Sequence, residues 1–307
     1  MLEISVPEAC AGWRLDRFLA EQIPEATRAA VQRWIAAGRV WVDGRTRKPS
    51  YRLRPGEKVT ADPPPAEPLE LVPDAISLRV LYEDEDVLVV DKPAGLVVHP
   101  GAGVRRGTLA NALVHRYRDL PQAETLRPGI VHRLDKGTSG LLVVALNEVA
   151  HHRLVRQFQR REVDKRYVAL LYGHLQPAEG GIDLPLGRDR RQRTRISGNT
   201  DRPRPALTLY RVLRYYPAGF TLVEARPVTG RTHQIRVHFW SRGHPVVGDE
   251  TYQRRDKTRA LPGGGHLGRL FLHAAELEFT HPRTGERLRF AAPLPPELAA
   301  LLDRLEQ

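Results

Sequence analysis

Residues 129–145 read GIVHRLDKGTSGLLVVA, and this stretch does most to decide both the fold and the site. A loop dense in charged side chains is followed by a turn with two glycines and then by an apolar run, Gly140–Ala145, that predicts a buried strand. A loop anchored on a buried strand can hold a carboxylate rigidly in a cleft, and here that carboxylate belongs to Asp135. A lone loop aspartate more often caps a turn or pairs with a neighbour such as Arg133, so both interpretations stay open at this point.

A second cluster, from Arg226 to Asp249, reads RPVTGRTHQIRVHFWSRGHPVVGD. Its central part, Thr232–Trp240, has helical spacing, which would place Thr232 and Arg236 four residues apart on one face. An inward-facing Arg236 would need an anionic partner, and a guanidinium beside Asp135 would keep that carboxylate ionised and oriented. The alternative is an ordinary surface helix with scattered positive charge.

A third cluster, from Val163 to Gly173, reads VDKRYVALLYG. Lys165 and Arg166 precede Tyr167 at the start of an apolar strand. The ring of a tyrosine in this position could stack on a base that has swung out of a nucleic acid. Most tyrosines in strands are core residues with a solvated hydroxyl, so that interpretation also stays open.

The composition favours a polyanion partner and a reducing compartment. The 307-residue chain carries 48 Lys and Arg against 36 Asp and Glu, a formal net charge of +12. A basic surface is typical of proteins that bind nucleic acid, and the competing explanation is a general compositional bias toward arginine. The single cysteine, Cys10, excludes internal disulfides and thiolate metal clusters. No apolar run approaches the roughly 18 residues of a membrane span and no export signal is recognisable, so we expect a cytoplasmic protein without membrane contact.

The chain is expected to divide into a small N-terminal module and a large domain. From Trp13 to Gly38 the apolar spacing predicts two short helices, and strands are expected at Arg39–Gly44 and within Tyr51–Ala61. The segment Asp62–Asp74 holds five prolines in thirteen residues and is expected to be an extended linker. The predicted domains are residues 1–62, a proline-rich linker at 63–76 and a large domain at 77–307.

The large domain mixes strands with helices. Strands are predicted at Val87–Asp91, Leu96–His99, Gly140–Ala145, Tyr167–Tyr172, Ala206–Leu213, Phe220–Pro227 and Leu277–Thr280. Helices are predicted at Thr108–Tyr117, Val149–Arg161 and Thr232–Trp240. Because several strands follow one another without an intervening helix, we expect an α+β fold with a mixed, largely antiparallel sheet and flanking helices, in addition to the small N-terminal α/β module.

The three clusters, in this order, resemble the RluA family of pseudouridine synthases, and the resemblance extends from Arg79 to about Pro293. The family signature HRLDxxTSG stands at His132–Gly140, and GRTHQIR stands intact at Gly230–Arg236. The Trp13–Ala61 module resembles the αL RNA-binding motif found in a small-subunit ribosomal protein. The resemblance implies an enzyme that isomerises uridines in RNA and uses no cofactor.

The resemblance also implies roles for individual residues. Asp135 matches the catalytic aspartate, and Arg236 matches the arginine paired with it. Tyr167 matches the tyrosine that packs on the target base, and Arg133 matches the arginine that fills the space of the flipped nucleotide. Leu272 is expected to form an apolar wall of the uracil pocket. Further substrate contacts are expected from His132, Thr138, Arg231, His233 and Gln234, and no metal site is expected.

Two arginine-rich stretches bear on how RNA is held. At Arg202–Tyr210 the chain has Pro203-Arg204 where the family usually has Gly-Lys, and arginine and lysine are not equivalent at a phosphate or stacking site. The stretch RDRRQRTR at Arg188–Arg195 holds five arginines in eight residues. We interpret it as an arm for the RNA backbone, and the alternative is a solvated loop.

The predicted function is an RNA pseudouridine synthase of the RluD-like branch, acting as a monomer on large-subunit ribosomal RNA. The choice of branch depends on the His99–Gly103 stretch with the Thr108–Leu113 pattern, together with the N-terminal module. The alternatives are a pseudouridine synthase acting on transfer RNA and a non-catalytic RNA-binding factor for ribosome assembly. A non-catalytic factor would not need Asp135, Tyr167 and Arg236 together. RNA is the expected partner, and DNA is not.

Overall fold

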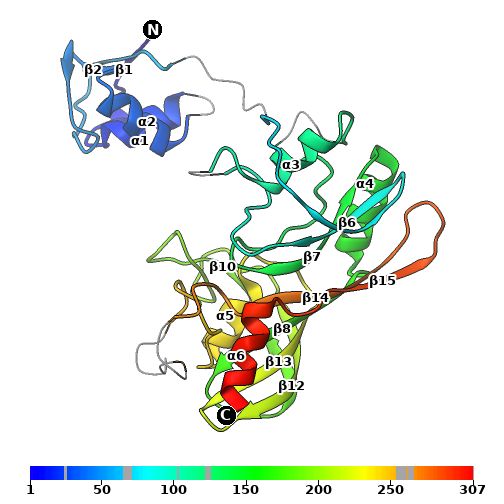
Figure 1. The fold of residues 1–307 in the computed structure, drawn as a ribbon. Coiled ribbons are helices and arrows are strands. Elements are labelled where there is room, and N and C mark those ends of the chain that lie inside the picture. The colour runs from blue at the N-terminus through cyan, green and yellow to red at the C-terminus, as the bar shows by residue number, and fades with distance from the viewer. Residues whose placement is uncertain are drawn as a thin grey trace. The chain divides into compact units, whose positions relative to one another are not determined.

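The computed structural model describes residues 1–23, 26–64, 71–101, 104–121, 126–253, 261 and 266–306. The chain forms two compact units, Met1–Leu69 and Glu70–Gln307, which are considered separately below (Figure 1). Among the described residues, no helix is long and apolar enough to cross a membrane.

The N-terminal unit is a four-stranded antiparallel sheet packed with two helices. The strand order is β1-β4-β2-β3, with β1 at Leu2–Ser5, β2 at Val40–Val42, β3 at Arg45–Thr46 and β4 at Lys58–Ala61. A short 3-10 helix at Glu8–Cys10 precedes the helices α1, Leu15–Gln22, and α2, Arg28–Ala36. The helix pair expected within Trp13–Gly38 is therefore present, and the strand expected within Tyr51–Ala61 lies at its end, Lys58–Ala61.

Helix propensity and capping explain where these elements begin. The side chain of Thr27 accepts a hydrogen bond from the backbone N–H of Ala30 and so caps the start of α2. At the other end of the unit, Asp43 and Gly44 both have positive φ, which gives the tight turn between β2 and β3 the twist that a hairpin needs. Apolar side chains from α1, α2 and the sheet then form one core, which includes Phe18, Val31 and Val40.

One charged side chain is buried in this unit. Asp16 in α1 has no exposed side-chain surface and accepts hydrogen bonds from Arg14, Arg28 and Gln32. Burial alone would raise its pKa, but these hydrogen bonds and the two guanidinium charges hold the pKa of Asp16 well below its usual range. Asp16 thus fastens α1 to α2 through charge-assisted bonds.

We expect Asp16→Asn to destabilise the N-terminal unit by about 1–3 kcal/mol at pH 7, since buried groups would lose charged hydrogen-bond partners. Because the folded pKa lies below the unfolded value of about 3.9, the stabilisation is fully present above that value and is lost as the pH falls below it. Three of the four tryptophans, Trp13, Trp34 and Trp41, lie in this unit, so urea unfolding followed by tryptophan fluorescence reports mainly on it. An equal midpoint for the variant and the wild type at pH 7 would contradict the assignment.

The second unit is built on a nine-stranded sheet with the order β5-β6-β7-β14-β8-β13-β12-β9, and β15 also pairs with β14. The strands are β5 Arg79–Glu83, β6 Val87–Lys92, β7 Ser139–Ala145, β8 Asp164–Tyr172, β9 Glu179–Asp183, β12 Leu207–Tyr216, β13 Phe220–Pro227, β14 Leu272–Thr280 and β15 Arg287–Ala291. Strands β7 and β14 pair in parallel, and the other pairings described within this sheet are antiparallel. The expected α+β fold with a mixed, largely antiparallel sheet is confirmed.

Helices cover both faces of this sheet. They are α3 Leu109–Arg116, α4 Glu148–Arg160, α5 Gln234–Ser241 and α6 Pro296–Glu306, and a separate small hairpin joins β10, Gly187–Arg188, to β11, Ile196–Ser197. Alternate residues of β6 and β7 point to opposite faces, so one set packs in the core shared with α3 and α5 and the other set packs with α4. The apolar run of β7 is buried along its whole length because both of its faces are covered.

Some predicted elements of this unit differ from the structure, and the strand expected at Leu277–Thr280 already begins at Leu272. Leu96–His99 is not a strand, because the carbonyls of Val97 and Val98 accept hydrogen bonds from the N–H groups of Leu109 and Ala110 in the first turn of α3. The helix expected from Thr232 begins at Gln234 instead. His233 adopts the left-handed conformation, with φ of 56°, so the preceding residue cannot belong to the same helix.

The proline-rich segment is described only in part, since residues 65–70 lie outside the described residues. Beyond them, the carbonyl of Val72 accepts a hydrogen bond from Asn111, and the carboxylate of Asp74 accepts one from the N–H of Gly107. Residues 71–74 are thus attached to the second unit beside α3. The predicted linker bounds of 63 and 76 remain a prediction.

Candidate active site

The site is centred on Arg236, which bridges two carboxylates. Its Nη1 donates to Asp135 over 2.9 Å, while Nε and Nη2 donate to Asp249 over 2.7 and 3.0 Å. The side chain of Arg236 is 10% exposed, Asp249 is fully buried, and Asp135 is 23% exposed. Burial opposes the charge of Arg236, but the hydrogen bonds and charges of Asp249 and Asp135 raise its pKa above the ordinary value. The sequence prediction that Arg236 lies beside Asp135 agrees with this geometry.

Arg236, Asp135 and Asp249 form a triad, and local structure orients its two carboxylates. Asp135 ends the charged loop before β7, where its carbonyl accepts a hydrogen bond from the N–H of Thr138. Asp249 also accepts hydrogen bonds from the N–H groups of Thr251 and Tyr252, which orient its carboxylate toward α5. The Tyr252 ring lies under the guanidinium of Arg236, at 5.1 Å from the ring centroid. Only one carboxylate of the triad, that of Asp135, therefore has exposed surface.

A glycine holds the loop of Asp135 against the centre of the sheet. Gly140 opens the parallel contact between β7 and β14, where it is in register with Ala274. A Cβ atom at this position would lie 2.3 Å from the carbonyl oxygen of Ala274, and the φ of Gly140 is +111°. The glycine at this point of the sequence motif is thus required by the close approach of two strands.

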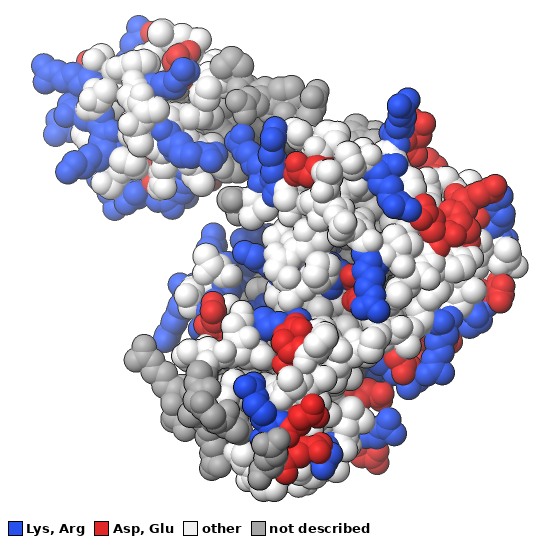
Figure 2. Space-filling view, in the orientation of Figure 1, with Lys and Arg blue, Asp and Glu red and all other residues white. Residues whose placement is uncertain are grey.

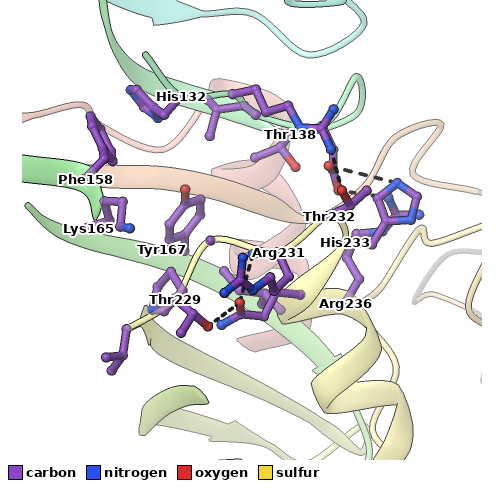
Figure 3. A pocket seen from close by; sticks show the side chains of 18 of the residues that line it. His132, Thr138, Phe158, Lys165, Tyr167, Thr229, Arg231, Thr232, His233 and Arg236 are labelled. Atoms are coloured by element: carbon purple, nitrogen blue, oxygen red, sulfur yellow. Dashed lines mark hydrogen bonds and ion pairs between the residues drawn. The ribbon is translucent and has the colours of Figure 1, made fainter. Parts of the chain in front are cut away.

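Two pockets meet at the exposed side of Asp135. The first has a volume of about 580 Å³ and is also bordered by Tyr167, Leu272 and Arg231, while the second, of the same volume, extends toward His99. Each lies in the size range of pockets that bind small organic groups. Figure 3 shows the first pocket, with Tyr167 on one side and His233 and Arg236, at the start of α5, on the other.

The wall opposite the triad is aromatic and apolar. Tyr167 in β8 is 9% exposed, and burial, with a smaller contribution from the charge of Asp135, raises its pKa above the ordinary value. Leu272, at the start of β14, is 3% exposed and borders the same pocket. A neutral phenol ring and a leucine offer the dry surface on which a planar base packs.

Of the residues predicted to contact the substrate, His132 forms part of the wall of the first pocket. Its Nε2 accepts a hydrogen bond from the N–H of Val143, and its ring stacks on Phe158 with 4.5 Å between centroids. Burial and the nearby charge of Lys165 lower the pKa of His132 to about 3, so the ring is neutral at physiological pH. Lys165, missed by sequence reasoning as a site residue, also borders the pocket, and burial lowers its pKa.

Arg133 and His233 lie at the junction of the two pockets. Arg133 is exposed, and its guanidinium donates a hydrogen bond to the hydroxyl of Thr232. The Nε2 of His233 lies 4.0 Å from Oδ1 of Asp135, the oxygen that Arg236 does not bond, and Nδ1 of His233 is hydrogen-bonded to the Tyr252 hydroxyl. Burial lowers the pKa of His233, while the charge of Asp135 opposes that shift.

The other predicted contacts are of two kinds. The amide of Gln234 is bonded to Thr229, Thr208 and two backbone groups, so its side chain supports the loop that forms the pocket floor. Arg231 donates to the carbonyl of Pro205 and borders the pocket. Thr138 is buried in the pocket wall, and its hydroxyl has no hydrogen-bond partner among the described residues.

Two groups of side chains among the described residues have the spacing of metal ligands, and neither borders the pockets at Asp135. One is Glu148, His151 and His152 on α4, and the other is Asp84, Asp86 and His281. In the second group, His281 bonds Asp84 and Arg283 bonds Asp86, so these carboxylates already have cationic or hydrogen-bonding partners.

Comparison with known proteins agrees with this geometry. The sequence profile of RNA pseudouridylate synthases matches residues 86–241, and that of the S4 domain matches residues 13–59. An uncharacterized RNA pseudouridine synthase of Chloroflexus aurantiacus is 48% identical over 303 residues, which are 99% of this chain and 93% of that protein. Ribosomal large subunit pseudouridine synthase D of Xanthomonas campestris is 43% identical over 311 residues, covering 98% of this chain and 92% of that protein.

A solved structure supports the same relationship. The human protein RNA Pseudouridylate Synthase Domain Containing 1 superposes with a TM-score of 0.58 at 32% identity, covering 74% of this chain and 89% of the human one. Fold and site thus define an RNA-modifying isomerase. The chain belongs to the RNA pseudouridylate synthase family and carries an S4 domain near its N-terminus.

Asp249, like Lys165, is a site residue that sequence reasoning did not single out. We expect Asp249→Asn to lower kcat by about 10- to 100-fold with little change in KM, because Arg236 would lose the anchor that orients it toward Asp135. The measurement is steady-state kinetics of tritium release from RNA labelled at uridine C5. A fall in RNA affinity with unchanged kcat would instead place Asp249 in RNA binding.

Proposed function

We propose that this pseudouridine synthase modifies uridines of large-subunit ribosomal RNA, with the Asp135 carboxylate as the reacting group. The ribosomal target is supported by the relative named ribosomal large subunit pseudouridine synthase D, which matches over nearly the full length of both chains. The reacting group is supported by one observation above the rest, the partly exposed Asp135 carboxylate held by the buried Arg236 at the edge of a base-sized pocket.

The reaction breaks the bond between uracil N1 and the ribose C1′, turns the base, and joins C5 to C1′. The C5 proton is lost and N1 gains one, so no electrons are exchanged with an external acceptor. Asp135 either adds to C1′, adds to uracil C6 or removes the 2′ proton, and each route uses the carboxylate oxygen that Arg236 leaves free. Arg236 donates to Oδ2, which leaves Oδ1 facing the pocket beside His233.

The base must leave the RNA stack before it can reach this oxygen. Extrusion costs a few kcal/mol, offset by stacking and phosphate contacts in the enzyme. In this proposal the base packs on Tyr167 and Leu272 within the first pocket, and the exposed Arg133 occupies the space that the base leaves behind. The hydrogen bond from Arg133 to Thr232 orients the guanidinium at the pocket edge before RNA arrives.

The N-terminal S4 domain supplies further RNA contacts in this proposal. Figure 2 shows Lys and Arg side chains spread over the visible face of this unit, with few acidic side chains among them. The exposed basic residues of this unit include Arg33, Arg45, Lys48, Arg52 and Arg54. Such charges bind phosphates without reading the sequence. Residues of one chain border the pocket at Asp135, which supports the proposal that the enzyme acts as a monomer.

Asp135→Asn is expected to abolish turnover while RNA binding persists, because the amide keeps the shape of the carboxylate but loses its nucleophilicity and basicity. Tritium release and a filter-binding assay on the same RNA measure the two properties. Asp303→Asn, an exposed change on α6, is the matched control and should behave as the wild type. Turnover near the wild-type rate in Asp135→Asn would end the assignment.

Arg133→Ala is expected to reduce kcat/KM on a folded stem–loop by about tenfold more than on a short single strand, since only the folded RNA has a gap to fill. Arg304→Ala on α6 provides the matched loss of an exposed arginine. An equal loss on both RNAs would argue against insertion of Arg133.

The RNA target is tested by chemical tagging of pseudouridines across total RNA, with and without the gene. The proposal expects signals that disappear from large-subunit ribosomal RNA alone. Loss of pseudouridine signals from transfer RNA would instead identify transfer RNA as the substrate. If no signal disappears when the gene is absent, the proposed ribosomal target is contradicted.

A further inference from the structure

The end of α4 carries a residue in an unfavourable backbone conformation. Arg161 follows the helix with φ of 62° and ψ of 31°, the left-handed region that glycine adopts most readily. The N–H groups of Arg161 and Glu162 bond the carbonyls of Phe158 and Gln157, which is the hydrogen-bond pattern of a helix end normally closed by glycine. An arginine here costs folding stability, and such local strain is often retained where the side chain has a function.

The side chain of Arg161 borders the same pocket as Asp135 and Tyr167. Arg231 borders this pocket too, and among the described residues its guanidinium donates only to a backbone carbonyl, that of Pro205. Arg204 is not among the residues that border the pocket, but it directly precedes Pro205, whose carbonyl accepts the hydrogen bond from Arg231. Two guanidinium groups from separate segments of the chain therefore lie at the pocket, and Arg204 adjoins the contact that holds one of them.

The positive charges of these three arginines are not paired with nearby carboxylates, unlike those of neighbouring arginines. Within the part of the chain that the structure describes, no carboxylate lies within 4.0 Å of the guanidinium groups of Arg161, Arg204 or Arg231. By contrast, the adjacent Arg160 pairs with Glu162, and Arg166 contacts Glu224 and Glu276. Burial, followed by the charges of Arg204 and Arg161, lowers the pKa of Arg231 below its ordinary value. Three like charges without a carboxylate are poised for an anion.

We propose that Arg161, Arg204 and Arg231 form a binding site for a single phosphodiester group of the RNA, beside the nucleotide whose base enters the pocket. The inference rests on the proposed function, because it takes the first pocket to be the base site. A base bound on Tyr167 leaves its sugar and phosphate at the pocket mouth, and three planar guanidinium forks match the oxygens of a phosphate. The arginine at 204 is favourable here, since a lysine would offer a point charge instead of a fork.

The backbone strain permits a discriminating test. Arg161→Gly removes the guanidinium and relieves the left-handed conformation, so the variant should fold at least as well as the wild type. Arg161→Asn is a second variant with a residue that tolerates this conformation. Arg160→Ala, which removes the neighbouring arginine that does not border the pocket, is the matched control.

Binding to an unmodified transcript of large-subunit ribosomal RNA is measured for each variant at several salt concentrations, together with Tm. We expect Arg161→Gly and Arg161→Asn to weaken binding about tenfold and to reduce the slope of log Kd against log salt by about one, with an unchanged or higher Tm for the glycine variant. Arg160→Ala should have a clearly smaller effect on both. Equal affinity and salt slope for Arg161→Gly and the wild type would overturn the proposal.

A shared ligand also predicts coupling between the arginines. The double variant Arg161→Gly, Arg231→Ala should lose less affinity than the product of the two single losses, because both residues hold the same phosphate. Strictly multiplicative losses would indicate separate contacts and contradict a common site. If the wild type and its variants show these effects but no pseudouridine forms, the proposed function fails while the phosphate site stands. If turnover occurs and Arg161 has no effect, only the phosphate site is lost.

Discussion

The site depends on the buried guanidinium of Arg236 between Asp135 and Asp249. A buried arginine needs anionic partners, and the fully buried Asp249 supplies one through two hydrogen bonds. The remaining nitrogen then holds Asp135 at the pocket edge. The free-energy cost of removing these charges from water is met when the protein folds. The Asp135 carboxylate is therefore already oriented before any substrate binds. The loop before β7 and the start of α5 are brought together by this one bridge.

The sheet explains why residues so distant in sequence can meet. Asp135 precedes β7, Tyr167 lies in β8, and Leu272 begins β14, which lies between those two strands. The order β7-β14-β8 thus places the loop of Asp135 on one side of β14 and Tyr167 on the other. The left-handed residue His233 then turns the chain into α5, so that Arg236 faces the loop.

Much of this arrangement could be predicted from sequence, and the exceptions have physical causes. The buried strand β7 and the Asp135–Arg236 pair follow from apolar runs and from two dense motifs. Leu96–His99 was expected as a strand because apolar spacing does not reveal that its carbonyls cap α3. The edge strands β5 and β15 alternate between half-buried and exposed residues, so their sequence patterns are weak. Asp249 looked like an ordinary loop residue, since only the fold shows that it is buried beside Arg236.

The close packing at Gly140 shows that residues of the same sequence motif are required for two different reasons, one chemical and one structural. In the proposed function, Asp135 is present in that motif for chemistry, whereas the glycine five residues later is present because Ala274 leaves no space for a side chain. A library of variants across the motif that is scored only for activity would treat both positions alike. Scored also for the amount of soluble protein, it should separate them, because a methyl group at 140 would push apart the two central strands and reduce the yield of folded enzyme.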